Sequence, residues 1–219
     1  MPIERKQIVK PYLLLCEGRD AEGFLMHYLN SNELAQDQRL SNEIQVLDFG
    51  GNDDLGSFLM NLKNMDKFDQ VTSLAIIRDA EKDFAKSCQE VSGSLKKCGF
   101  ISSERCGTWV KNDTGLNVGF ILFPLNNKAG TLEDLCLQIL SEKNNKTILS
   151  SIDNFLAAMK SSYGRQYRRK HKNKLHTYLS SSDKYVTMPL GLASSAGAFD
   201  WGSSELEPLK NFLIEGFNT

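Results

Sequence analysis

The sequence predicts an α/β protein in which helices flank a mainly parallel four-stranded sheet and a helical extension follows at the C-terminus. Two observations predict this class. An apolar run followed by a helical pattern occurs three times in the first half of the chain, and such alternation is typical of a parallel sheet. The runs are continuously apolar, as expected for strands that helices cover on both faces. With 219 residues, the chain is long enough for one large core plus an appendage.

Each of the three units pairs a strand with a helix. The expected strands lie at 8–16, 43–51 and 71–77, and the helices at 20–31, at 53–63 and in a segment that ends near Cys98. The fourth strand is expected at 118–124, where residues 107–112 can pair with it as a hairpin. A helix follows at 131–140, with Thr131 as its N-cap.

The C-terminal part has a different pattern. Aromatic and apolar side chains recur at every fourth residue, which predicts one or two helices with a single apolar stripe, interrupted near Gly164: Phe155, Met159, Tyr163, Tyr167, His171, Leu175 and Leu179. A loop of small residues is expected at 190–204 and a closing helix at 205–217. The predicted domains are an α/β domain at 1–145 and a helical extension at 146–219 that packs on it.

Charge divides along the same line. Residues 1–153 hold 17 Lys and Arg against 22 Asp and Glu, a net of −5, whereas residues 154–219 hold 9 against 5, a net of +4. Between Asn154 and Ser182 there are seven basic residues and no acidic one. This segment either forms a solvated helical face or lines a groove that binds phosphate. The candidate phosphate contacts are Arg165, Arg168, Arg169 and Lys170.

The composition also bears on the compartment. No apolar run approaches the roughly 20 residues that cross a bilayer, and the N-terminus lacks the apolar core of a signal peptide. The five cysteines contain no C-x-x-C pair, which argues against a structural zinc site and a disulfide framework. We therefore expect a cytoplasmic protein with reduced thiols and no membrane partner.

Carboxylates follow three of the expected strands. The groups are Glu17 with Asp20 and Glu22, Asp79 with Glu81 and Asp83, and Glu133 with Asp134. Parallel strands end at one edge of a sheet, so these acids can converge there. A cluster of this kind does not stay ionised without cations, and its few hydrated oxygens suit Mg²⁺ or Mn²⁺. Acids after strands also cap helices, and this structural explanation covers Asp20, Glu22 and Asp83.

The motifs "CEGRDAEGFL", "IIRDAEKD" and "GTLEDL", in this order, resemble the three acidic motifs of Toprim domains. The resemblance is greatest to the Toprim modules of OLD-type nucleases and their stand-alone relatives, and it covers most of the chain. It implies a Toprim-like, Rossmann-like fold. It also implies that Glu17 binds metal or acts as a general acid/base, and that Asp79 and Glu81 form a metal pair.

The same resemblance implies roles for further residues. Glu133 matches a distal acid of the metal site, and Asp20 or Glu22 an accessory acid. Asp83, in the same strand-end group as Asp79 and Glu81, is a further candidate accessory acid. Either Lys172 or Lys174 matches a catalytic lysine held near the scissile phosphate. The chain departs from the family pattern in two respects: Glu81 stands where a second aspartate is expected, and no G-x-x-x-x-G-K-[ST] ATPase motif is present.

The leading hypothesis for function is metal-dependent hydrolysis of phosphodiester bonds in DNA or RNA, with one or two Mg²⁺ or Mn²⁺ ions as cofactor. The alternative is a weakly active or inactive module that binds nucleic acid or a separately encoded ATPase. Phosphoryl transfer on a small molecule is a third possibility. No tyrosine or serine is placed as a convincing nucleophile, so a covalent, topoisomerase-like step has no support.

Overall fold

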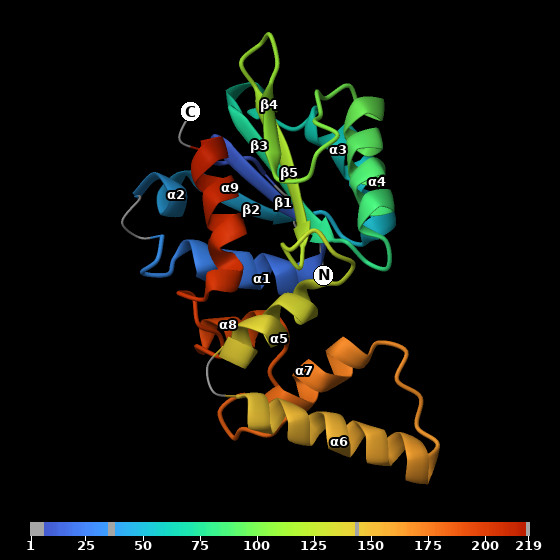
Figure 1. Ribbon diagram of the computed structural model, residues 1–219. Helices are drawn as coiled ribbons and strands as arrows, with labels where there is room; N and C mark the ends of the chain where they lie inside the picture. Colours follow the sequence, from blue (N-terminus) through green and yellow to red (C-terminus); the bar gives the residue numbers. More distant parts are fainter. Residues whose placement is uncertain (1–6, 35–37, 143–144, 218–219) are drawn as a thin grey trace, which may run out of the picture.

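A five-stranded mixed sheet lies at the centre of the molecule (Figure 1). The computed structural model describes residues 7–34, 38–142 and 145–217. The strand order is β2-β1-β3-β5-β4, in which β4 is antiparallel to β5 and the other neighbours are parallel. The strands are β1 (Tyr12–Cys16), β2 (Ile44–Asp48), β3 (Ser73–Asp79), β4 (Thr108–Lys111) and β5 (Asn117–Phe123). The predicted α/β class is confirmed, and the hairpin partner of the fourth strand adds a fifth strand to the predicted four.

Helices cover both faces of this sheet, with α3 and α4 on one face and α1, α5 and α9 on the other (Figure 1). The helices are α1 (Gly18–Leu29), α2 (Gln38–Glu43), α3 (Leu55–Leu62), α4 (Phe84–Lys97), α5 (Leu132–Glu142), α6 (Lys146–Tyr163), α7 (Lys170–Ser180), α8 (Leu190–Ser195) and α9 (Glu207–Phe217). Short 3-10 segments lie at η1 (Asn52–Asp54), η2 (Phe68–Gln70) and η3 (Ser204–Leu206). Within the described ranges, none of the helices has the length and apolar character needed to cross a membrane.

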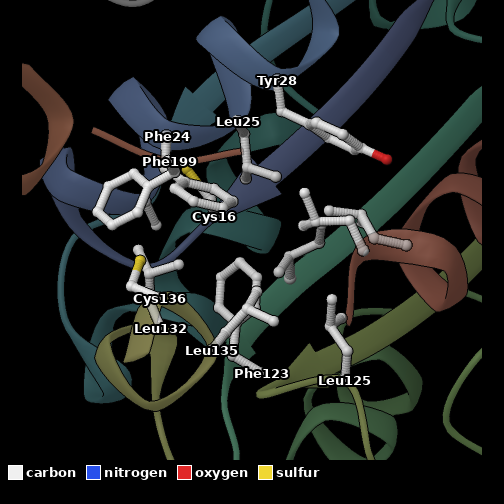
Figure 2. Packing of buried hydrophobic residues seen from close by; sticks show 14 of the residues in the cluster. Cys16, Phe24, Leu25, Tyr28, Phe123, Leu125, Leu132, Leu135, Cys136 and Phe199 are labelled. Carbon is white, nitrogen blue, oxygen red and sulfur yellow. The ribbon is translucent and has the colours of Figure 1, made fainter. Parts of the chain in front are cut away.

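The side chains of β1 show why its run is continuously apolar. Leu13 and Leu15 pack in the cluster under α3 and α4, whereas Leu14 and Cys16 point to the opposite face. Successive strand residues face opposite sides, so a strand buried on both sides needs apolar residues throughout. Figure 2 shows the cluster on the second face, where Cys16 lies near Phe24 and other buried side chains.

The strand begins later than the sequence predicts, and the first helix begins earlier. β1 starts at Tyr12 rather than at residue 8, directly after Pro11, which has no N–H for a sheet hydrogen bond. α1 starts at Gly18, two residues before the predicted position. Glu17 is therefore the only residue between β1 and α1.

The predicted loop of small residues at 190–204 contains a helix, α8. This short helix packs on α1, where Gly23 faces Gly191. A Cβ atom on Gly23 would lie 2.8 Å from the Gly191 Cα, so the two backbones approach this closely because Gly23 has no side chain. Residues 190–195 of the predicted loop therefore form a packed helix, and the loop itself is confined to residues 196–203.

The C-terminal helix α9 belongs to the core of the sheet. Trp109 on β4 stacks on Phe212 with ring centroids 4.7 Å apart, and its indole N–H donates to the Phe212 carbonyl at 2.9 Å. A Cβ on Gly216 would lie 1.9 Å from the Trp109 ring, so glycine leaves the space that the indole fills. The core on this face is thus continuous across the predicted boundary between 145 and 146.

The helices α6 and α7 form a hairpin beside the body of the molecule (Figure 1). The predicted apolar stripe is wrong for α6: Phe155 and Tyr163 are 52% and 72% exposed, and the helix buries Leu149, Ile152 and Leu156 instead. Each step of four residues turns 40° beyond a full helical turn, so a long row of such steps leaves the buried face. The stripe does hold in α7, where both of its leucines are buried.

The chain order reverses direction across β1. After β1 the chain forms β2 on one side of it and then crosses to β3 on the other side. The connections that leave the carboxyl ends of β1 and β3 therefore run in opposite directions along the sheet. Open α/β sheets bind ligands at such a switch point. Glu17 follows β1 directly and Asp79 ends β3.

Candidate functional site

Two strand-end carboxylates meet at the switch point. β1 and β3 are paired in parallel register, with Cys16 opposite Ile77, and the Glu17 N–H donates to the Ile77 carbonyl at 3.2 Å. Asp79 is two residues beyond Ile77 on the same edge, and the two carboxyl groups are close enough that the charge of Glu17 raises the pKa of Asp79. The expectation that acids from separate βα units converge therefore holds for this pair.

The carboxyl group of Glu17 lacks a full set of partners. Its side chain is 17% exposed, and within the part of the chain that the structure describes its Oε2 atom is buried without a hydrogen bond. Burial raises the pKa of Glu17, the Arg78 guanidinium opposes this rise, and Glu81 adds to it. Arg78 is close but not hydrogen-bonded, with Nε 3.9 Å from Oε2. This oxygen is thus available to a cation or a proton.

Asp79 is the more perturbed acid of the pair. Burial raises its pKa to about 7, although the Leu132 N–H donates to Oδ1 at 2.9 Å and favours the charged form. The charges of Glu17, Glu133 and Glu81 raise the pKa further. Four carboxylates from three βα units therefore interact electrostatically at this edge.

Glu133, in the first turn of α5, is a charged carboxylate that already has a cationic partner. Burial alone would raise its pKa, but hydrogen bonds from Lys172 and Thr131 lower it overall. The Lys172 Nζ lies 2.8 Å from Oε1, and the Thr131 hydroxyl donates to Oε2 at 2.7 Å. Burial lowers the pKa of Lys172, but the hydrogen bond and charge of Glu133 and the charge of Asp79 together raise it, so the lysine carries a charge.

Glu81 lies differently from its predicted partner Asp79. Its backbone has a φ of 54°, in the left-handed region, and exchanges two hydrogen bonds with Gly130, at 2.9 and 2.7 Å. Its side chain is exposed. The backbone bridge ties the segment after β3 to the loop before α5. Because the Glu81 side chain lines the cleft and is exposed, it borders the site on the solvent side.

These residues line one cleft of about 1530 Å³ between the sheet edge, α1 and α7. The acids of the cleft come from the sheet edge, and its bases come mainly from the hairpin. Of the predicted site residues, the cleft contains Glu17, Asp20, Asp79, Glu81, Glu133, Arg168, Arg169 and Lys172. The structure therefore brings all four predicted metal ligands and one of the two candidate lysines to one cleft.

The predicted accessory acids have structural partners. Asp20 accepts a hydrogen bond from the Gly191 N–H at 3.0 Å, which ties α8 to α1. Glu22 accepts one from the Asp48 N–H at 3.3 Å. Asp83 caps α4 through the Lys86 N–H at 3.0 Å. Only Asp20 of these three lines the cleft.

The two candidate lysines are separated by the helix that carries them. Lys174 lies 2.6 Å from Asp153 on α6, and Lys170 lies 3.2 Å from the same carboxylate. These contacts join α7 to α6 and lie outside the cleft, whereas Lys172 lines it. Lys172 is therefore the lysine that the structure places beside the acids.

The carboxylates of the cleft fit a divalent cation only in part. Within the described ranges, no group of three or more His, Cys, Asp or Glu side chains is arranged to hold a metal ion. Two features nevertheless fit such an ion: the bare Oε2 of Glu17, and the pKa of Asp79, which burial and then the charges of the neighbouring acids raise. Hard oxygen donors of this type suit Mg²⁺ or Mn²⁺, which keep several waters and need few protein ligands. Glu17 and Asp79, with Glu81 from the solvent side, would hold it.

Two supporting residues were not predicted. Arg78 is 3% exposed inside β3 and pairs with Glu90 at 3.2 Å as well as with Glu17. Asp48 accepts the N–H groups of Gly18 at 2.8 Å and Gly50 at 2.7 Å, so it fixes the turn that carries Glu17. Arg78 could have been found from the sequence, because it is a single arginine in the apolar run "SLAIIRD" and a buried charge requires a partner.

Comparison with known proteins gives one family. The family model described as "Protein of unknown function (DUF3226)" matches residues 11–218. No curated protein and no solved structure matches the chain. The match extends from the residue before β1 to beyond the end of α9, and so includes every element that lines the cleft. The chain therefore belongs to the DUF3226 family.

Proposed function

We propose that this protein is a metal-dependent phosphodiesterase that hydrolyses nucleic acid, with a Toprim-like fold similar to that of OLD-type nucleases. One observation carries the proposal: at the switch point of the sheet, Glu17 and Asp79 are held together with raised pKa values, opposite the charged Lys172. Perturbed acids in a cleft are typical of sites that bind a cation or transfer protons. A cytoplasmic DNA or RNA is the proposed substrate.

The residues of the cleft would have different roles in hydrolysis. A divalent cation bound by Glu17 and Asp79 would supply Lewis-acid activation of the phosphate and of a water molecule. In hydrolysis the water oxygen bonds to phosphorus, one P–O ester bond breaks, and the departing sugar oxygen takes up a proton. Glu17 would exchange this proton at whichever of its two carboxylate oxygens the cation leaves free.

Lys172 is suited to neutralise charge on the phosphate. Its ammonium group has three N–H donors, of which the contact with Glu133 at 2.8 Å uses one. The side chain lines the cleft and is partly exposed. The remaining donors can therefore contact a phosphate oxygen as negative charge develops.

The experiment is a cleavage assay on plasmid and on single-stranded DNA and RNA, with Mn²⁺, Mg²⁺ or a chelator. We expect cleavage that requires the cation and falls by about 100-fold or more in Glu17→Gln and Asp79→Asn. Asp69→Asn is the matched control, because Asp69 is an exposed acid in η2 before β3, at the opposite end of the strand. Equal activity of the cleft variants and the control would refute the proposal.

A second function is favoured by the position of Glu81. Its exposed side chain, on a left-handed backbone, leaves the cleft without a third preassembled donor among the described residues. A chain of this kind could bind nucleic acid or a separately encoded ATPase with little or no catalysis. Tight nucleic-acid binding without cleavage under every metal condition would identify this module.

A further inference from the structure

We infer that the loop between α6 and α7 binds an unpaired nucleic-acid strand, with Tyr163 as a stacking platform and Arg165, Arg168 and Arg169 as phosphate contacts. The inference deepens the proposed function and rests on it, because it names the form of the substrate that enters the cleft. It concerns residues 163–169, which end α6 and lead into α7.

The first observation is an aromatic ring left in solvent. Tyr163 is 72% exposed at the last position of α6, and Gly164 ends the helix with a φ of 64°. The chain turns away at this glycine, so one end of the helix presents the ring without cover. Tyr167, which is partly buried, follows in the same loop. Exposed aromatic rings stack on bases of any sequence, because every base has a π-face.

The second observation is unbalanced positive charge around this ring. Among the described residues, Arg165, Arg168 and Arg169 have no carboxylate within ion-pair distance, and all three are exposed. The neighbouring lysines of α7 do have such partners, since Lys170 pairs with Asp153 and Lys172 with Glu133. In the described part of the chain, the three arginines of the loop are thus free cations, as a phosphate-binding surface requires.

The third observation is continuity with the acids. Arg168 and Arg169 line the same cleft as Glu17 and Asp79, and Lys172 lies one turn further along α7. A strand held at Tyr163 would therefore pass the two arginines before its backbone reaches Lys172. The order of side chains along the loop and α7 matches a path from a base contact, through phosphate contacts, to the candidate reaction centre.

An unpaired strand fits this surface better than a duplex. In a duplex the bases are already stacked, so a contact with Tyr163 would cost a few kcal/mol of unstacking. The acids also lie deep in the cleft, since Asp79 and Glu133 are largely buried and α7 covers one side. A single strand can enter with its backbone against the arginines, whereas a paired strand would bring its partner against the hairpin.

The experiment measures binding without cleavage. Fluorescence anisotropy in chelator, over a salt series, compares a labelled oligothymidylate, its RNA equivalent and a blunt duplex of the same length. We expect tighter binding of both single strands than of the duplex. Tyr163→Ala should weaken single-strand binding by about 5-fold or more, and Tyr163→Phe should restore it, because the ring rather than the hydroxyl stacks. Phe155→Ala, which removes another exposed ring of α6, should have no effect.

The arginines are tested through the salt dependence. The double variant Arg168→Gln/Arg169→Gln should lower the slope of log affinity against log salt by about 1.4, since each phosphate contact on a single strand contributes about 0.7. Lys111→Gln is the control, because Lys111 is an exposed lysine on β4 opposite the first residue of β5, far along that strand from its carboxyl end. Its slope should equal that of the wild type.

The outcomes separate this inference from the proposed function. Single-strand binding that depends on Tyr163 and the arginines, in a protein that cleaves nothing, supports the inference and refutes the nuclease. Cleavage that is indifferent to these substitutions refutes the inference and leaves the nuclease standing. Equal or tighter binding of the duplex, or no nucleic-acid binding at all, as expected for a protein-docking surface, also overturns the inference.

Discussion

Asp79→Asn should make the protein more stable at pH 8. Burial and neighbouring acids raise the pKa of Asp79 from its ordinary value of 3.8 to about 7 in the folded protein. The folded state therefore binds a proton that the unfolded chain has released between these two pH values. The contribution of Asp79 to the free energy of unfolding is complete below pH 4 and is lost as the pH rises through 7.

The size of this loss follows from the two pKa values. A tenfold change in an acid constant is worth about 1.4 kcal/mol, so a rise from 3.8 to about 7 corresponds to about 4 kcal/mol at pH 8. Asparagine stays neutral at every pH, and its side-chain oxygen can still accept the Leu132 N–H now bound at 2.9 Å. The variant should thus equal the wild type at pH 4 and exceed it at pH 8, with a Tm higher by about 10 °C.

Thermal unfolding from pH 4 to pH 8, with and without Mg²⁺ or Mn²⁺, measures this effect. A cation that binds the folded protein at 100 times its Kd should stabilise the wild type at pH 8 by about 2.7 kcal/mol, and the variant by less. Asp69→Asn controls for the loss of an exposed acid and should follow the wild type at all pH values. The reasoning is wrong if Asp79→Asn is the less stable protein at pH 8, since its charge would then stabilise the fold.

Two further predictions concern α7 and the packing of α9. Lys172→Met should reduce cleavage by about 100-fold in the nuclease assay, whereas Lys174→Met should stay within about twofold, because only Lys172 lines the cleft. Gly216→Ala should lower the free energy of unfolding by about 3 kcal/mol in urea denaturation, because its Cβ would lie 1.9 Å from the Trp109 ring. Gly93→Ala is its control in α4, where a Cβ meets nothing within 4 Å and should stabilise by about 0.5–1 kcal/mol.

The sheet could be predicted from the sequence because strands buried on both faces appear as continuous apolar runs. β1 is apolar along its length and β3 and β5 are apolar at most positions, while acids mark two of the strand ends: Glu17 directly follows β1 and Asp79 ends β3. Parallel pairing then places the residues after β1 and at the end of β3 at one edge. This inference needs no side-chain detail, so the sequence alone was enough to predict that Glu17 and Asp79 lie close together.

The helical hairpin was harder to predict because its faces depend on helix rotation. Successive residues turn by 100°, so Lys172 and Lys174 differ by about 200° and cannot both face the cleft. Which of them does so is set by the contact of α7 with α5, and by Asp153 on α6, which takes Lys174. The four-residue repeat through Phe155 and Tyr163 misled for the same reason. These contacting residues are distant in sequence, so the periodicity of one helix cannot predict which of its faces they cover.

The arrangement of charge explains why the hairpin and the sheet edge belong to one site. Carboxylates alone would repel a phosphate, and burial together with the charges of Glu17, Glu133 and Glu81 already raises the pKa of Asp79. The base that faces them, Lys172, comes from the hairpin and pairs with Glu133 on α5. The free arginines of the loop extend this positive charge outward from the cleft. A polyanion can therefore approach along the hairpin and meet the acids only where a cation balances them, which makes the two halves of the cleft interdependent.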